Sequence, residues 1–265
     1  MISGESVIYD LDAIRSQSPL VHNITNYVVM NTTANALLAV GASPVMAHAV
    51  DEVEDMVQIA SSLVINIGTL SKSWIDAMIK AGKAARKRNI PLVLDPVGAG
   101  ATSYRTLTGL QIINECRPGV IRGNASEIIS LISEQGNTKG VDSIASPESA
   151  LRTAEKLAKE TGAVIVISGP VDYIIDNQSV IQVRNGSPMM GKVTGLGCSA
   201  TALVGAFMAV NKNFLNASAH AMTVMGIAGE LAARRSNGPG TMQVNFLDAL
   251  HNLSEKEIMS HFNAG

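Results

Sequence analysis

The sequence predicts an α/β fold in which helices cover both faces of a mostly parallel central sheet, giving three layers. Over the C-terminal three quarters of the chain, short apolar runs alternate with longer segments of helical periodicity. Runs that are apolar on both faces are typical of parallel strands buried between helices. The 265 residues suit one large domain and contain no internal repeat or low-complexity linker. We therefore expect residues 1–265 to form a single domain.

The composition excludes several classes of protein. Hydrophobic residues make up 46% of the chain, charged residues 16%, and the net charge is −2. Intrinsic disorder requires low hydrophobicity and high charge, so it is excluded as the main state. No global basic field exists, and we expect neither nucleic acid nor an anionic membrane as a partner. The low charge fits either an oligomer that hides surface or a core rich in alanine and glycine.

The first residues do not resemble a signal peptide, because no basic segment followed by an apolar segment opens the chain. We expect a cytoplasmic protein whose two cysteines, Cys116 and Cys198, are reduced. Residues 18–50 carry no charge, but they include many Asn, Thr and His side chains that a bilayer core disfavours. We expect a buried helix at residues 28–40 and no transmembrane segment.

The first clear strand and helix follow in order. Residues 63–67 are an apolar run ended by a glycine, which predicts a strand. Ser73 is the expected N-cap of the next helix, whose apolar residues recur at helical spacing. Gly82 lies on the same face, where a glycine allows close packing. The basic segment 83–88 suits the C-terminus of that helix.

The remaining elements continue the alternation. Before residue 18 we expect no more than a short helix. Two runs around Asn177-Gln178 predict a hairpin at an edge of the sheet. We expect strands at residues 91–95, 120–122 and 163–168, the hairpin strands at 173–176 and 179–184, and helices at 125–133, 148–161, 198–210, 215–235 and about 245–256.

Polar residues follow several of these strands. Ligands of open α/β sheets bind beyond the carboxyl ends of the strands. Asp95, Arg122 and Ser168 stand at three such ends, and Asn124 follows Arg122 closely. A glycine-rich turn at residues 194–199 opens a helix. These residues therefore form the candidate site.

The glycine-rich turn predicts an anion hole. Gly195 and Gly197 let backbone N–H groups approach an anion, and the N-terminus of the helix adds unpaired donors. The turn lacks the Gly-Lys-Ser/Thr of a Walker A loop and the third glycine of the dinucleotide fingerprint. A glycine-rich helix start without any ligand is the competing interpretation.

Cys198 stands at the start of that helix. The helix dipole is expected to lower the pKa of a thiol there, which would suit a base or a nucleophile. The competing interpretation is that Cys198 is a small buried hydrophobic residue, as free cysteines often are. The glycine turn directly before it favours a functional role.

Arg122, Asp95 and Glu127 complete a set suited to phosphoryl transfer. An arginine that ends an apolar strand is suited to a phosphate. Asp95 could end a simple turn, and Asn124 with Glu127 could form only a capping box. Acidic groups near an anion-binding turn also predict a divalent cation. Phosphoryl transfer needs mainly positioning and charge neutralisation, which such a set supplies.

Two other chemistries are excluded by spacing. The sequence contains no G-x-S-x-G nucleophile elbow. It also has no Cys/His cluster with the spacing of a zinc site. The histidines are scattered, and we interpret most as structural or surface residues: His22, His48, His220, His251 and His261.

Five motifs in this order resemble the hydroxyethylthiazole kinase family of thiamine salvage, within the ribokinase-like superfamily. They occupy residues 19–26, 41–46, 95–97, 121–127 and 195–198. The resemblance extends from about Ser18 to the last helix. It implies a ribokinase-like fold and ATP-dependent phosphorylation of 4-methyl-5-(2-hydroxyethyl)thiazole. It also implies Mg²⁺ and a homotrimer with active sites between subunits.

The resemblance implies roles for individual positions. Arg122 and Ser168 match ATP-binding positions, and we expect Asn124 and Thr194 to contribute there. Met46 and Gly195 match thiazole-binding positions, and Asn23 is expected nearby. Asp95 and Glu127 match the acidic positions for magnesium.

Cys198 matches the position of the catalytic base. Most of the wider superfamily has aspartate there, so the cysteine marks this branch. The alcohol loses its proton late in a loose transition state, so a strong base is not essential. Cys198 either accepts that proton or only positions the hydroxyl.

Three alternatives stay open from the sequence. One is a nucleotide-dependent dehydratase of hydrated nicotinamide cofactors on the same fold, although such enzymes carry aspartate at the position of Cys198. Another is a nucleotide-binding regulator without turnover. The third is a related kinase that acts on a pyrimidine or sugar alcohol.

Overall fold

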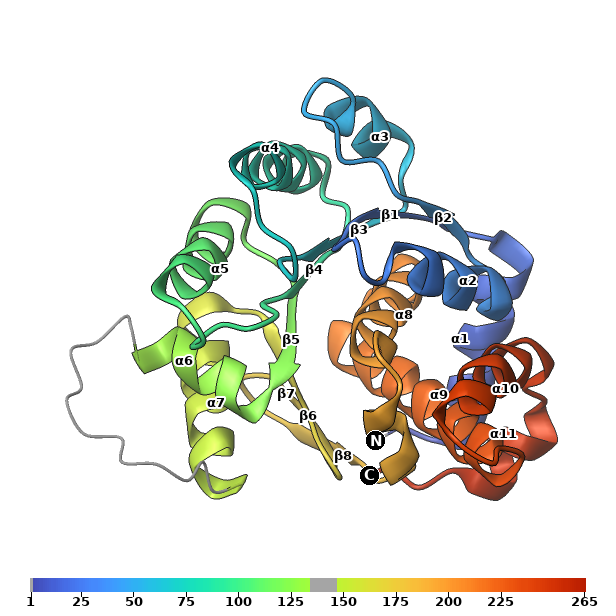
Figure 1. Cartoon of the computed structure of the whole chain (residues 1–265). Coiled ribbons are helices and arrows are strands. Elements are labelled where there is room, and N and C mark those ends of the chain that lie inside the picture. Colours follow the sequence, from blue (N-terminus) through green and yellow to red (C-terminus); the bar gives the residue numbers. More distant parts are fainter. Residues whose placement is uncertain (1, 134–146) are drawn as a thin grey trace.

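The computed structural model describes residues 2–133 and 147–265, and its centre is one eight-stranded sheet (Figure 1). The strand order is β2-β1-β3-β4-β5-β6-β7-β8. Strands β1 to β6 are parallel, whereas β7 pairs antiparallel with both β6 and β8 at the edge, as the expected hairpin requires. The bounds are β1 Leu20–Ile24, β2 Ser43–Val45, β3 Ser62–Asn66, β4 Leu92–Asp95, β5 Val120–Asn124, β6 Val164–Ser168, β7 Asp172–Ile175 and β8 Val180–Val183.

Helices cover both faces of the sheet, which confirms the predicted three-layer α/β fold (Figure 1). One face carries α1 Gly4–Gln17, α2 Met30–Val40, α8 Leu196–Val210, α9 Phe214–Arg234, α10 Pro239–Asn252 and α11 Glu255–His261. The other carries α3 Val53–Ile59, α4 Lys72–Arg88, α5 Ser103–Cys116, α6 Ala125–Ser133 and α7 Pro147–Thr161. A short 3₁₀ helix, η1, spans Pro188–Lys192. No described helix is long and apolar enough to cross a membrane.

Successive strand residues alternate between the two faces, because the side-chain period of a strand is two. In β3, Val64 packs under α8, whereas Leu63 and Ile65 pack under the helices of the other face. The strands are therefore apolar on both sides, which is the pattern that predicted them. The same alternation decides which polar residues of the strand ends face α8.

Several local predictions need correction. Ser71, not Ser73, caps α4, because its side chain accepts the N–H of Trp74. The single helix expected at about 245–256 is two helices, because Ser254 forms a capping box with Glu257 and starts a new one. Helix α2 begins at Met30 rather than residue 28.

Some elements have no counterpart among the predictions. These are β1, β2, α3 and α5, and α1 is a full 14-residue helix rather than a short one. Strand β1 was hidden because His22 and Asn23, although polar, are buried in it. Helix α1 buries Val7, Leu11 and Ile14, a spacing of four and three residues that could have revealed it.

Gly205 packs α8 closely against β3 of the sheet. A Cβ there would lie 2.6 Å from Cγ2 of Val64. We expect Gly205→Ala to lower the free energy of unfolding by about 1–2 kcal/mol, because overpacking outweighs the better helix propensity. Urea unfolding measures it. Gly240→Ala in α10, where a Cβ meets nothing, is the matched control and should not destabilise. Equal stability of both variants would contradict the close packing.

Candidate active site

The carboxyl edge of the parallel strands brings most of the predicted residues together. Strand alternation turns Asn23, Asp95, Arg122 and Ser168 toward the α8 face, since each lies two residues beyond a core residue of that face. Helix α8 packs on β1, β3 and β4. Its N-terminus therefore lies over the edge where these side chains end.

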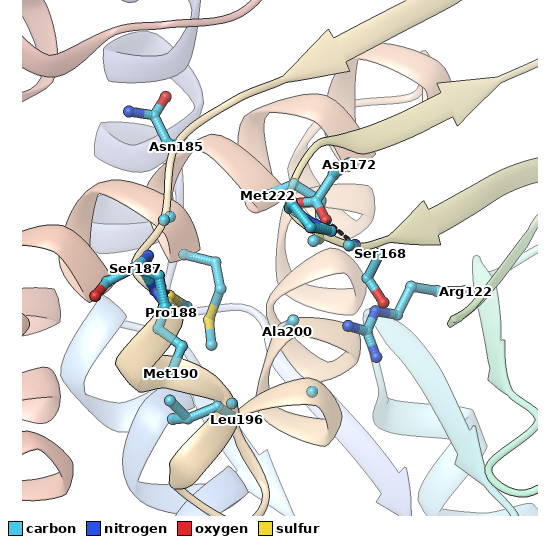
Figure 2. Close-up of a pocket in the computed structure, with 17 residues that line it drawn as sticks. Arg122, Ser168, Asp172, Asn185, Ser187, Pro188, Met190, Leu196, Ala200 and Met222 are labelled. Carbon is cyan, nitrogen blue, oxygen red and sulfur yellow. Dashed lines mark hydrogen bonds between the residues drawn. The ribbon is translucent and has the colours of Figure 1, made fainter. Parts of the chain in front are cut away.

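A cavity of about 490 Å³ opens between β6, β7, η1, α8 and α9 (Figure 2). Arg122, Ser168 and Gly197 line it, as does the buried carboxyl group of Asp172. Met190, Met222 and Met225 supply an apolar wall. The other predicted residues lie outside its lining: Asn23, Met46, Asp95, Asn124, Glu127, Thr194, Gly195 and Cys198.

Arg122 has no hydrogen-bonding partner among the described residues. Its side chain belongs to a residue only 9% exposed, and the buried Nε is unpaired. The guanidinium reaches the glycine-rich turn, where a Cβ at Gly197 would lie 3.2 Å from Nη1. A buried guanidinium without a protein acceptor is costly unless an anion pairs with it. The geometry therefore suits an anion between Arg122 and the turn.

The glycine-rich turn itself starts α8. Gly195 is the N-cap, with φ of 87°, a conformation that favours glycine. A Cβ there would also lie 2.9 Å from Cγ1 of Val29, so the turn packs against the start of α2. The helix begins at Leu196, two residues earlier than predicted, and no side chain caps it. Its first N–H groups are therefore available to an anion.

A hydrogen-bonded network beneath the turn was missed by sequence reasoning. Asn66 donates to Asp95 Oδ2 at 2.9 Å, and Thr201 Oγ1 donates to the same oxygen at 2.8 Å. Asn26 donates to Asn66 Oδ1 at 2.9 Å and lies 3.6 Å from the sulfur of Cys198. The position of Asn66 at a strand end was the available signal. The network fixes the carboxylate of Asp95 relative to Cys198.

Asp95 is almost fully buried, so its pKa depends on the groups around it. Burial raises the pKa of Asp95 to about 6, while Arg122 and the hydroxyl of Thr201 oppose the rise. The carboxylate of Glu127 adds to it by repulsion. The two acidic groups and the arginine therefore act on one another, as the proposed set for phosphoryl transfer requires.

The expected low pKa of the Cys198 thiol is wrong. Burial is the largest cause that raises the pKa of Cys198 to about 11, and the negative charge of Asp95 adds to it. Hydrogen bonds from Asn66 and Asn26 and the charge of Arg122 only partly oppose this. The helix dipole does not overcome burial next to a carboxylate. Both described cysteines are free, as expected.

Asn124 and Glu127 form the capping box that the sequence left open. Asn124 Oδ1 accepts the N–H of Glu127, and Glu127 Oε2 accepts the N–H of Asn124. Glu127 Oε1 also accepts the N–H of Gly98 in the loop after β4. The cap therefore holds the carboxylate of Glu127 beside the loop of Asp95.

The side chains of this site that suit Mg²⁺ as ligands are the carboxylates of Asp95 and Glu127. The described residues include no group of three or more His, Cys, Asp and Glu side chains suited to a metal. Magnesium is commonly held by one or two carboxylates, with water and phosphate oxygens completing its shell. Asp95 Oδ1 accepts no hydrogen bond from the described residues, and each oxygen of Glu127 accepts one. The pair fits magnesium held jointly with a phosphate.

Of the predicted thiazole-binding residues, Asn23 lies in β1, Met46 directly follows β2, and Gly195 is the N-cap of α8. Asn23 is buried and donates to Val21 O, while its Oδ1 has no partner. Met46 is half-buried in the segment after β2. Thr194, expected at the nucleotide, is exposed beside Gly195.

Asp172 gives the free energy of unfolding a pH dependence. Burial raises its pKa from the ordinary 3.8 to about 6, so the folded state binds the proton more tightly. This contribution to stability is complete below pH 3.8 and is lost as pH rises through 6. We expect Asp172→Asn to gain about 1–2 kcal/mol relative to the wild type between pH 5 and pH 8. Urea unfolding at both pH values tests this, and a parallel pH response of the two proteins would contradict it.

The chain resembles known proteins in sequence as well as in fold. The sequence model of the hydroxyethylthiazole kinase family matches residues 11–256. A hydroxyethylthiazole kinase of Leptospira biflexa is 56% identical over 98% of this chain and 97% of the relative.

Solved structures agree with the sequence matches. The hydroxyethylthiazole kinase of Pyrococcus horikoshii OT3 superposes with a TM-score of 0.92 at 42% identity, over 98% of each chain. A ribokinase-like superfamily protein of Enterococcus faecalis superposes with a TM-score of 0.68 at 15% identity, over 97% of this chain and 96% of the other. This second likeness concerns the fold alone.

Proposed function

The chain belongs to the hydroxyethylthiazole kinase family, and we propose that it phosphorylates the primary alcohol of 4-methyl-5-(2-hydroxyethyl)thiazole with ATP at the carboxyl edge of its sheet. The observation that carries the site assignment is Arg122, a buried guanidinium with no described protein acceptor beside the N-terminus of α8. A transferred phosphoryl group needs such a concentration of positive charge. The γ-phosphate of ATP would lie between Arg122 and the Gly195–Gly197 turn.

ATP extends from this point into the cavity. Ser168, at the end of β6, supplies a hydroxyl beside Arg122 (Figure 2). The apolar wall of Met190, Met222 and Met225 suits the adenine ring. Asn124 and Thr194 stay predictions for the same nucleotide, and neither lines the cavity.

Asp95 and Glu127 are the residues that would hold Mg²⁺ together with the phosphates. When bound, the metal neutralises charge on the phosphate oxygens. The chain's own contribution is to orient these carboxylates. Asn66 and Thr201 fix Asp95, and the backbone N–H groups of Gly98 and Asn124 fix Glu127.

The acceptor alcohol would approach from the side of Asn23, Met46 and Gly195. Cys198 lies in the first turn of α8, directly after Gly197. Its raised pKa keeps the thiol protonated at neutral pH. A protonated thiol has no site for a second proton, so Cys198 orients the hydroxyl rather than acting as its base. The alcohol proton leaves late in a loose transition state, when it can pass to an oxygen of the transferred phosphoryl group.

The experiment that tests the function is a coupled ADP-release assay with ATP, Mg²⁺ and hydroxyethylthiazole. ADP release that requires the thiazole is the expected result. Its absence from folded protein would contradict the proposal and direct attention to another alcohol or to hydrated nicotinamide cofactors. The homotrimer and the cytoplasmic location stay predictions from the family resemblance.

Substitution of Cys198 separates its two roles. We expect Cys198→Ala to lower kcat by about 10-fold, less than the 10²–10⁴-fold typical of a full general base, because the protonated thiol only orients the hydroxyl. Cys198→Asp should keep or raise kcat, because a carboxylate accepts the proton more readily. The same ADP-release assay measures both variants. Equal kcat of the wild type and both variants would show that Cys198 only fills space.

A further inference from the structure

Asp172 is a buried carboxyl group, and only one of its two oxygens accepts a hydrogen bond from the described residues. It is the first residue of β7 and is 7% exposed. Its Oδ1 accepts the N–H of Gly169 at 2.9 Å, which fixes the side chain at the cavity wall (Figure 2). No described residue donates a hydrogen bond to its Oδ2. One acceptor oxygen in the cavity wall is thus available to a ligand.

The chemistry of a carboxylate restricts what can occupy this position. A phosphate oxygen would be repelled, whereas a hydroxyl or amino group can donate a hydrogen bond. Alternation along β7 turns Asp172 to the same face as Ile174, toward α8 and α9. Asp172 is close enough to Arg122 for the arginine charge to act on its carboxyl group. The carboxyl group therefore stands near the phosphate end without belonging to it.

The position of Asp172 beside Ser168, on the side of the cavity where the triphosphate would lie, identifies the donor (Figure 2). Arg122 and Ser168 lie on one side of the cavity, and Pro188 and Met190 lie on the opposite side (Figure 2). With the triphosphate at the first side and the adenine ring among the methionines, the ribose follows directly after the phosphates and comes next to Asp172. Its 2′- and 3′-hydroxyls are the donors that a carboxylate at this place can accept.

We propose that Asp172 binds the ribose hydroxyls of the nucleotide and makes the enzyme select ribonucleotides over deoxyribonucleotides. The inference rests on the proposed function in placing a nucleoside triphosphate in the cavity. It adds a residue that determines which sugar is accepted. A carboxylate built to hold a hydroxyl is left unpaired by the deoxy analogue, which gives the discrimination.

The test is the ratio of kcat/KM for ATP to that for 2′-deoxyATP and 3′-deoxyATP. We expect a wild-type ratio of about 10 or more for at least one analogue, mainly through KM. In Asp172→Ala, kcat/KM for ATP should fall by about 10-fold while the ratio approaches one. In Asp172→Asn, the amide can still accept from Gly169, so the fold is kept and the ratio should fall to an intermediate value.

The matched control is Asp176→Asn, a carboxyl of the same hairpin that lies outside the cavity and accepts the N–H groups of Gln178 and Ser179. Its ratio should equal that of the wild type. A wild-type ratio near one, or a ratio unchanged in Asp172→Ala, would overturn the inference. A merely structural role would lower activity with all three nucleotides equally.

Binding keeps this test separate from the proposed reaction. Calorimetric titration with ADP and 2′-deoxyADP measures the same discrimination without any acceptor alcohol. Weaker binding of 2′-deoxyADP to the wild type, lost in Asp172→Ala, would support the role of Asp172 even without thiazole phosphorylation. Equal binding of the two nucleotides to the wild type would overturn the 2′-hydroxyl contact. ADP release that never depends on thiazole would count only against the proposed function.

Discussion

Replacing Arg122 by alanine is expected to lower kcat/KM for ATP by about 10²–10³-fold, as loss of a positioned charge donor typically does. The free energy of unfolding should change little. Arg122 makes no hydrogen bond to the described residues, so the substitution removes a buried charge without breaking a hydrogen bond, and the lost attraction to Asp95 and Asp172 offsets this gain. Arg122→Lys should recover only part of the activity, because an ammonium group lacks the planar fork of the guanidinium.

The measurement combines the ADP-release assay with urea unfolding of the same preparations. Arg86→Ala is the matched control, because Arg86 is exposed on α4 and far from the sheet edge in the chain's fold. It should leave both quantities unchanged. If Arg122→Ala kept most of its kcat/KM, the anion would not lie beside this guanidinium. If it unfolded instead, Arg122 would be a structural residue.

Replacing Asp95 by asparagine should have the second large effect, with opposite signs on activity and stability. We expect kcat to fall by about 10²-fold or more, because the neutral amide loses the charge that would hold magnesium at the phosphates. At pH 8 the free energy of unfolding should rise. The carboxylate is buried, and burial is what raises its pKa to about 6, so its ionisation costs the folded state free energy.

The hydrogen bonds of the site make this substitution a clean one. Asn66 and Thr201 both donate to one oxygen of Asp95, and the amide oxygen of an asparagine can accept both. Asp76→Asn, on the exposed face of α4, is the control for removing a carboxylate without changing the site. Loss of stability together with activity in Asp95→Asn would show that Asp95 holds the fold rather than the reaction.

Arg122 and Asp95 have large expected effects for the same physical reason. Each is a buried charge at the carboxyl edge of the sheet, and the two charges act on each other. Groups that are costly for stability and well positioned for a ligand are typical of functional sites. Loss of activity without loss of stability distinguishes such residues from structural ones, whose loss lowers both.

Much of the fold was predictable from the sequence, because apolar runs bounded by glycine or proline mark strands whatever their partners. This was sufficient for β3 to β8 and for the edge position of the hairpin. It was insufficient for β1, whose buried His22 and Asn23 conceal the apolar pattern. Burial of a polar side chain is decided by its neighbours, and no local pattern announces it.

The residues of the candidate site were likewise only partly predictable from the sequence. Asp95, Arg122 and Ser168 were identified because strand ends in an α/β sheet meet at one edge, which makes position in the strand informative. Asn26, Asn66 and Thr201 were missed. They meet only because β1, β3 and β4 lie side by side and the start of α8 rests on their ends. Asp172 was missed because a carboxyl group in a hairpin reads as an ordinary surface residue.

The sequence by itself determined the layers, the strand-end residues and the glycine turn, because strand and helix periods, strand-end positions and glycine at positive φ are local properties of the chain. Only the tertiary structure decided the protonation of Cys198 and the orientation of Asp95 and Asp172. Burial and the approach of charges from distant strands set these properties. Asn26 and Asn66, for example, are 40 residues apart in the chain and 2.9 Å apart in the network. The pKa of Cys198 therefore rose where the local pattern predicted a fall, since burial beside Asp95 outweighs the helix terminus.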